Sequence, residues 1–280
     1  MSDNAGLKLI KQVIEYGSII GSPLASNTLQ GIIPEEVLEI GIPTLANSLK
    51  NIGQEYAERM LSPRENLRVG SALILAAEGI RERLKNENPR EDGFFDKNHT
   101  GRADAEEVLE NMVLKVQREP EEKKARYIAK IYENSVFEQE ISADLSHKII
   151  KSAEQLTYQH LCILSMVGRR EKGEDALRDL QLNPQLDHPL ELSKLLHDCF
   201  ELVTNGYIQG GLTFIFNGRL PQYETLNPNS MLLESIGKAI FDLMNLQDIS
   251  EKDIKPIAKL LGWEKKTASE SGEVSWNPKM

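Results

Sequence analysis

Two stretches decide the expected fold: LTYQHLCILSMVG at residues 156–168 and LELSKLLHDCFELVTNG at residues 190–206. Apolar residues recur in both at the three- and four-residue spacing of an amphipathic helix. Each stretch also closes on a glycine, Gly168 or Gly206, and glycine commonly terminates a helix. The sequence therefore predicts two helices here, the first ending at Gly168 and the second at Gly206.

A short β-hairpin is expected after these two helices. Tyr207-Ile208-Gln209 follows the second helix, and two glycines precede the extended segment Leu212–Phe216. Asn217-Gly218 is a dipeptide typical of hairpin turns, and a last helix is expected over Leu232–Leu243. The order of helix, helix, two-stranded wing and closing helix resembles the winged-helix fold.

The rest of the chain is expected to be mostly helical. Ser62-Pro63-Arg64-Glu65 predicts a helix start, because Ser62 can cap, Pro63 suits the first turn and Glu65 completes a capping box. Helical spacing of apolar residues also occurs over 7–17, from Pro34, over 45–60, over 105–118, after Pro120 and from Leu145. The expected fold class is mostly α: a multi-helical bundle followed by a winged-helix-like module with a small β-hairpin.

Composition and charge limit the classes of function. The 280-residue chain is 40% hydrophobic and 27% charged, as in ordinary globular proteins. Its formal net charge of −10 argues against non-specific attraction to nucleic acid or anionic membranes. The start Met1-Ser2-Asp3-Asn4 does not resemble a signal peptide, and glycines and prolines interrupt the apolar stretches. We therefore expect a cytoplasmic protein without membrane spans. Cys162 and Cys199 are expected to be buried reduced thiols, with a disulfide between them as the alternative.

One segment, residues 96–107, carries oxygen donors at regular spacing around a glycine. It resembles the calcium loop of EF-hand proteins, in which such donors surround a seven-coordinate cation. The resemblance implies a Ca²⁺ site whose ligands are Asp96, Asn98, Thr100, Arg102 (through its carbonyl), Asp104 and Glu107.

The same segment departs from the EF-hand pattern. Ala103 stands where a branched apolar residue is usual, Pro89 and Gly93 interrupt the entering helix, and there is no second loop. The alternative interpretation is structural: Asp104 caps the next helix and Glu107 closes a capping box. The expected domains are an N-terminal helical region (1–90), the EF-hand-like loop with central helices (91–168), the winged-helix-like module (169–263) and a flexible tail (264–280).

Three stretches of the central region carry a second resemblance: Tyr127-Ile128-Ala129 to Asn134, Leu156-Thr157 to Leu164, and Leu202 to Ile208. They are similar to stretches of bacterial proteins of the abortive-infection alpha type. The resemblance implies an association with phage defence and implies no activity.

Catalytic motifs are not recognisable in the sequence. His160-Leu161-Cys162 and His197-Asp198-Cys199 suggest zinc, but residues two apart on a helix point to opposite faces, so four ligands could not converge. Glu106-Glu107 is a pair of adjacent carboxylates, which do not face each other across a helical site. No nucleophile elbow, phosphate-binding glycine loop or His-Glu-x-x-His motif occurs.

These observations favour a non-enzymatic protein-interaction or regulatory subunit. The resemblance to abortive-infection proteins implies that this subunit belongs to a bacterial phage-defence complex. The alternatives are a winged-helix DNA-binding transcriptional regulator and a calcium-responsive switch. DNA binding needs cations on the recognition helix and wing, and the helix over 190–205 is net acidic. An exposed ridge formed by Arg169, Arg170, Arg178, Lys194 and Arg219 would favour the regulator instead.

Overall fold

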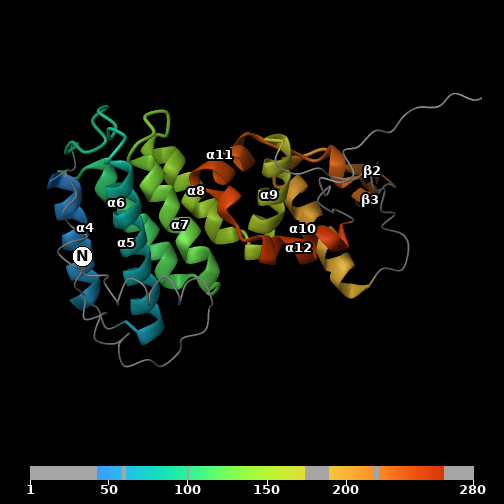
Figure 1. Ribbon diagram of the computed structural model, residues 1–280, viewed down its shortest axis with the longest axis horizontal. Coiled ribbons are helices and arrows are strands. Elements are labelled where there is room, and N and C mark those ends of the chain that lie inside the picture. Colours follow the sequence, from blue (N-terminus) through green and yellow to red (C-terminus); the bar gives the residue numbers. More distant parts are fainter. Residues whose placement is uncertain (1–42, 59–60, 100, 174–188, 217–220, 262–280) are drawn as a thin grey trace, which may run out of the picture. The chain divides into compact units, whose positions relative to one another are not determined.

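The expected mostly α fold class with a small antiparallel hairpin is confirmed, whereas the winged-helix resemblance stays a prediction. The computed structural model describes residues 43–58, 61–99, 101–173, 189–216 and 221–261 (Figure 1). The expected helices over 7–17 and from Pro34, and the expected tail over 264–280, lie outside the described residues. The chain forms two compact units. Unit 1 runs to Tyr158 and also includes Leu243–Asn245, and unit 2 comprises Gln159–Asp242 and the chain from Leu246 onward.

Unit 1 is a set of packed helices: α4 (Pro43–Glu58), α5 (Pro63–Arg83), α6 (Asp104–Arg118), α7 (Glu122–Ser135) and α8 (Ala143–Gln155). Helix α5 packs against α7 and α6, and α6 also packs against α8 (Figure 1). The apolar stripes expected from the sequence face inward, and their largest fully buried members are Leu45, Leu49, Leu73, Ile80, Leu109, Met112, Ile128 and Ile131. Burial of these stripes drives the packing of unit 1.

The start of α5 is the one that the sequence predicts. The Ser62 hydroxyl accepts a hydrogen bond from the Glu65 backbone N–H at 3.4 Å, and the Glu65 carboxylate accepts one from the Ser62 backbone N–H at 2.8 Å. Pro63 occupies the first turn. The reciprocal bonds satisfy two backbone donors that a helix start leaves unpaired.

Unit 1 closes with a segment far along the chain. The Asn134 side chain donates hydrogen bonds to the Leu243 carbonyl at 2.8 Å and to the Asn245 side-chain oxygen at 3.0 Å. The Asn134 side-chain oxygen accepts a hydrogen bond from Arg83 at 2.7 Å. Asn245 adopts a left-handed backbone conformation, with φ of 49°, which asparagine tolerates better than most residues. Leu243–Asn245 is therefore a structural part of unit 1.

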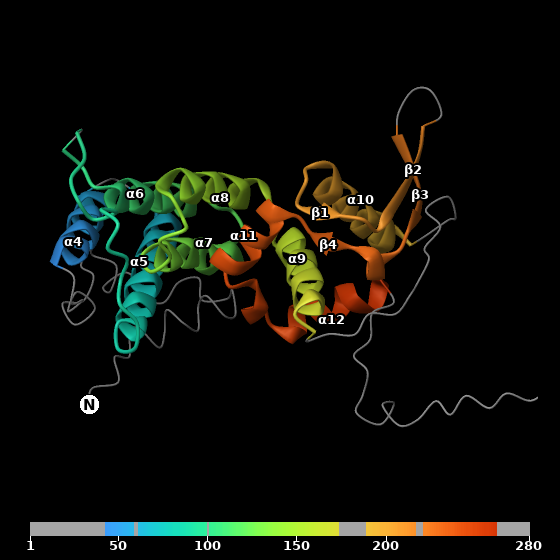
Figure 2. The same cartoon turned by 90° about the horizontal axis from the view of Figure 1, so that it is seen from above.

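Unit 2 contains α9 (Tyr158–Glu171), α10 (Leu190–Thr204), α11 (Ser235–Leu243) and α12 (Glu251–Leu260). Its strands are β1 (Ile208–Gln209), β2 (Leu212–Phe216), β3 (Pro221–Leu226) and β4 (Leu232–Leu233). Short 3-10 helices span Pro228–Ser230 and Leu246–Asp248. Strands β2 and β3 form an antiparallel hairpin that extends beyond the helices of unit 2 (Figure 2), and β1 pairs with β4.

Two element boundaries in unit 2 differ from the expectation. Helix α9 continues past Gly168 to Glu171, because this glycine brings the helix against an aromatic ring: a Cβ at Gly168 would lie 2.4 Å from Phe241. The closing helix begins at Ser235 rather than Leu232, since Leu232 and Leu233 pair with Gln209 and Ile208. The predicted turn at Asn217-Gly218 lies outside the described residues.

The division into units follows packing rather than the expected domain boundaries. The expected boundary at 90/91 lies within unit 1, where α5 packs against α6 and α7. The expected boundary at 168/169 lies within α9. Among the described residues, none of the helices combines the length and the apolar character that crossing a bilayer requires.

Candidate metal centre

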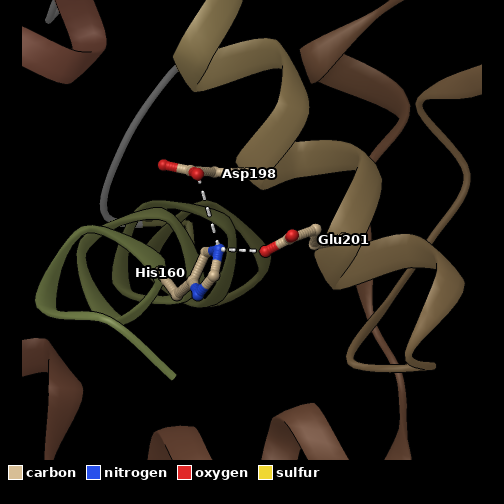
Figure 3. A group of neighbouring side chains, drawn as sticks. All are labelled: His160, Asp198 and Glu201. Atoms are coloured by element: carbon tan, nitrogen blue, oxygen red, sulfur yellow. Dashed lines mark ion pairs between the residues drawn. The ribbon is translucent and has the colours of Figure 1, made fainter. Parts of the chain in front are cut away.

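Two helices of unit 2 bring together three potential ligands of a cation. His160 lies in the first turn of α9, and Asp198 and Glu201 lie three residues apart on α10. Residues at this spacing share one face of a helix. Figure 3 shows the His160 ring pointing from α9 toward both carboxylates of α10.

The three side chains converge on a small volume. The Nε2 atom of His160 lies 3.7 Å from Asp198 Oδ1 and 3.4 Å from Glu201 Oε2 (Figure 3). One nitrogen and two carboxylate oxygens, one from each residue, all lie within 4.8 Å of one another. The His160 and Asp198 side chains are only 6% and 11% exposed, whereas Glu201 is 44% exposed. The cluster is therefore buried on one side and reachable from solvent through Glu201.

Burial dominates the electrostatics of Asp198. Loss of solvation raises the pKa of its carboxyl above the ordinary value, and the nearby His160 and Lys194 oppose this rise. The neighbouring Glu201 carboxylate raises the same pKa further, through like-charge repulsion. An added cation between these groups would favour the ionised form of Asp198.

The second oxygen of Glu201 has a different neighbour. Glu201 Oε1 lies 3.2 Å from His197 Nε2, one helical turn away on α10, and His197 is 63% exposed. Glu201 thus faces His160 with one oxygen and His197 with the other.

Both cysteines are buried, as expected, but they do not belong to the cluster. Burial raises the pKa of the Cys199 thiol to about 12, with a smaller contribution from Asp198. A thiol in this state is a poor metal ligand, because the thiolate is the form that coordinates. Within His197-Asp198-Cys199, the residue that belongs to the cluster is therefore Asp198, between the histidine and the cysteine.

The cluster was missed in the sequence for a physical reason. The spacing of Asp198 and Glu201 on one helix face is readable, but it is common among solvated helices. What identifies the site is the approach of His160 from another helix, and the pairing of α9 with α10 is a tertiary contact. The signal available beforehand was a histidine on a mostly apolar helix.

The predicted calcium ligands lie in unit 1, and whether they bind calcium stays a prediction. Asp96 is exposed, whereas Asn98, Asp104 and Glu107 are half-buried, and Thr100 lies outside the described residues. The Asn98 side chain approaches Asp104 Oδ1 at 3.4 Å. The Arg102 carbonyl accepts a hydrogen bond from the Asn98 backbone N–H at 2.8 Å. This bond closes the loop on itself around Gly101, whose φ is +82°.

The surroundings of the loop only partly follow the EF-hand arrangement. Helix α6 begins at Asp104, as an exiting helix would, but α5 ends at Arg83 and the described residues between 87 and 103 contain no entering helix. The alternative interpretation of a capping box is wrong, because Ala103 is the N-cap residue and no side chain caps α6. Ala103 is instead fully buried and pairs with Lys97 in an isolated β-bridge.

The segment before this loop is held by a buried arginine. Arg90 donates hydrogen bonds to the Ser135 carbonyl at 3.1 Å and to the Gln139 carbonyl at 3.3 Å. It also forms an ion pair with Asp92 and stacks over the Phe94 ring, 4.4 Å from the ring centroid. Arg90 therefore fixes the start of the loop against the end of α7.

Comparison with protein-family models, with curated proteins and with solved structures found no match for this chain.

Proposed function

We propose that this chain is a cytoplasmic, non-enzymatic protein-interaction or regulatory subunit, and that it acts in a bacterial phage-defence complex. The setting comes from the resemblance to abortive-infection alpha proteins. The observation that carries the preference for a protein partner over DNA is the burial of Arg169 in unit 2. This arginine belongs to the set of cations that a DNA-binding ridge would require.

Arg169 points into unit 2. Its guanidinium donates to Glu251 at 2.7 Å and to the Gln247 carbonyl at 2.6 Å, and it also donates to the Ile249 carbonyl. Its side chain is 7% exposed. These contacts secure the turn that precedes α12. An arginine committed in this way is not available to a phosphate backbone.

The neighbouring cation is also engaged within unit 2. The Arg170 guanidinium donates to the Met231 carbonyl, and burial lowers its pKa. Arg178 and Arg219 lie outside the described residues. Lys194 is exposed on α10, but Glu191 is exposed on the same helix and offsets its charge. The described residues of the expected recognition helix therefore offer little attraction for DNA.

Exposed apolar side chains support a protein partner. The large hydrophobic residues that are exposed within the described part of the chain are Leu190, Leu232 and Leu260, and all belong to unit 2. Leu190 at the start of α10 is the most exposed, at 81%. Contact with a partner would remove this apolar surface from water and gain free energy.

The experiment is co-expression of the full chain with the products of its neighbouring genes, followed by purification at physiological salt. We expect a stoichiometric complex that Leu190→Glu weakens, with Lys148→Glu on the exposed face of α8 as the control. A salt-dependent gel shift on the promoter of its own gene would favour the transcriptional regulator instead. Robust turnover of a nucleotide or nucleic acid by the isolated chain would contradict the proposal.

A further inference from the structure

We propose that His160, Asp198 and Glu201 form a zinc site that joins α9 to α10 within unit 2. The ligands would be Nε2 of His160, one oxygen of Asp198 and Oε2 of Glu201. The inference concerns the cluster alone, so it stands independently of the protein partner proposed above.

The spacing of the ligand atoms carries the first argument. Zinc binds imidazole nitrogen and carboxylate oxygen at about 2.0 Å in tetrahedral geometry, which places neighbouring ligand atoms about 3.3 Å apart. The separations from His160 Nε2 to the two carboxylates are 3.4 and 3.7 Å. All three ligand atoms lie within 4.8 Å of one another, so zinc binding would draw the two carboxylate oxygens toward His160 Nε2 and toward each other.

A direct ion pair explains the same spacing less well. Charge-assisted hydrogen bonds between nitrogen and carboxylate are normally about 2.7–2.9 Å long. Neither carboxylate of the cluster approaches His160 Nε2 that closely. Both carboxylates face the same nitrogen, and a cation between the three groups would coordinate one atom of each.

Burial supplies the second argument. A carboxylate removed from water loses solvation that must be replaced by a partner of opposite charge. Asp198 is mostly buried, and a second carboxylate lies beside it. Lys194 and His197 offset part of this negative charge from the solvent-exposed side, and a divalent cation at the three ligand atoms would compensate both carboxylates directly.

The donor types select the ion. Imidazole nitrogen favours zinc and other transition ions over calcium and magnesium, which prefer oxygen alone. No thiolate belongs to the cluster, so copper(I) is disfavoured. Three protein ligands leave a fourth tetrahedral position for water, as is usual where zinc sites are open. The exposure of Glu201 gives the ion a route from solvent.

Zinc at this position would link segments that are distant in the sequence. His160 precedes the part of the chain that contains residues 174–188, and Asp198 and Glu201 follow it. Bound zinc would therefore restrain α9 and α10 independently of that connection. It would stabilise unit 2 by an amount that rises with the free zinc concentration.

The experiment is zinc titration of the full chain by calorimetry after treatment with a chelator. We expect one zinc ion per chain, and Glu201→Gln should weaken binding by about 100-fold or more, since even loss of an outer-shell partner commonly costs 10–100-fold. Glu191→Gln removes an exposed carboxylate from the same helix and is the matched control. It should bind zinc as the wild type does.

Two further measurements keep the test decisive. His160→Gln should also lose zinc, whereas His197→Gln, which changes a contact of Glu201 outside the converging group, should weaken binding far less than Glu201→Gln does. Circular dichroism checks that each variant is folded, and Glu201→Gln carries the test if His160→Gln is not. Cobalt(II) should give the intense visible bands of a tetrahedral complex in the wild type. Failure of the wild type to bind zinc, or zinc binding unchanged in Glu201→Gln, would overturn the proposal.

Discussion

Buried charges are arranged differently in the two units. In unit 1, Lys124 Nζ lies 2.7 Å from Glu119 Oε2, and both side chains are 2% exposed. The other carboxylate oxygen of Glu119 accepts a hydrogen bond from the Glu121 backbone N–H at 2.9 Å. In unit 2, His160 Nε2 stands 3.4 and 3.7 Å from its two carboxylates. The first arrangement is a close pair whose second carboxylate oxygen is also bonded, whereas in the second a histidine and two carboxylates converge at longer separations.

This difference separates a structural ion pair from a candidate binding site. A buried pair repays its loss of solvation only when its geometry is good and its remaining polar atoms are bonded, and Lys124 with Glu119 meets this condition. The cluster of unit 2 has an excess of carboxylates and longer separations. Buried charged side chains alone therefore do not indicate a metal site. Several potential ligands that converge at the spacing of metal ligands do indicate a candidate site.

The largest effect is expected from breaking the close pair. Lys124→Ala would leave Glu119 buried without its cation, and we expect unfolding to become easier by about 3–5 kcal/mol. Urea denaturation followed by circular dichroism measures the change. Lys148→Ala, which removes an exposed lysine of unit 1, is the control and should alter stability by less than about 0.5 kcal/mol. An equally small effect in Lys124→Ala would show that the pair contributes little.

The next prediction tests whether packing sets the spacing of the cluster. An alanine Cβ at Gly168 would meet the Phe241 ring at 2.4 Å, so Gly168→Ala should displace α9 and cost about 1–3 kcal/mol through overpacking. Zinc binding should weaken although no ligand changes. The same denaturation and titration experiments measure both effects. Phe241→Leu combined with Gly168→Ala should recover part of the loss, and strict additivity of the two changes would contradict the assigned contact.

A smaller change in stability, and a gain rather than a loss, is expected when Asp198 is replaced. Because its pKa is raised in the folded state, its contribution to stability is present below the unfolded value of 3.8 and is lost as the pH rises through the folded value. In a chelator, Asp198→Asn should therefore be more stable than the wild type at neutral pH, while losing zinc. Thermal unfolding from about pH 4 to pH 7 measures the difference.

The result for Asp198→Asn sharpens the comparison between the units. A gain in stability together with lost zinc binding would show that the Asp198 carboxylate destabilises the metal-free protein. Glu191→Gln should show neither change. Lower stability of Asp198→Asn throughout the pH range would instead show that the Asp198 carboxylate stabilises the fold, as the Lys124–Glu119 pair is expected to do.

The smallest effect is expected at the loop over 96–107. The donors that the structure describes are exposed or half-buried, so calcium would gain little from a preformed site, and only a weak calorimetric signal is expected. Asp96→Ala and Glu107→Ala should each remove it, whereas His99→Ala should not. Absence of any calcium-linked heat in the wild type would end the calcium prediction.

Local patterns in the sequence predicted much of the fold. The capping box at Ser62 and Glu65 uses residues three apart, and the buried stripes of α5 and α6 follow from helical spacing, so both are readable from neighbours in the chain. Gly168 shows the limit of such reasoning. Glycine ends many helices, but here it permits a close contact with Phe241, which is 73 positions away by residue number. That contact depends on tertiary packing.

The candidate site was less predictable than the fold. His160 and Asp198 lie within the two His-x-Cys motifs of the sequence, but helical geometry argues against zinc at those motifs, and Glu201 lies outside both. The selection of Asp198 and Glu201 depends on which face of α10 meets α9. Arg169 illustrates the same difficulty, since this basic residue, which an exposed DNA-binding ridge would need, is buried against the turn before α12.

The hydrogen bond from Asn134 to the Leu243 carbonyl joins residues 109 positions apart. During synthesis Asn134 leaves the ribosome long before Leu243. The Asn134 side-chain amide therefore cannot form this hydrogen bond until Leu243 has been synthesised. Unit 1 can collapse around its apolar helices early, but this closure forms only after most of unit 2 has been translated. A fragment ending at Tyr158 would lack Leu243 and Asn245, the partners of the Asn134 side-chain amide. In the full chain, complete folding of unit 1 therefore follows synthesis of most of unit 2.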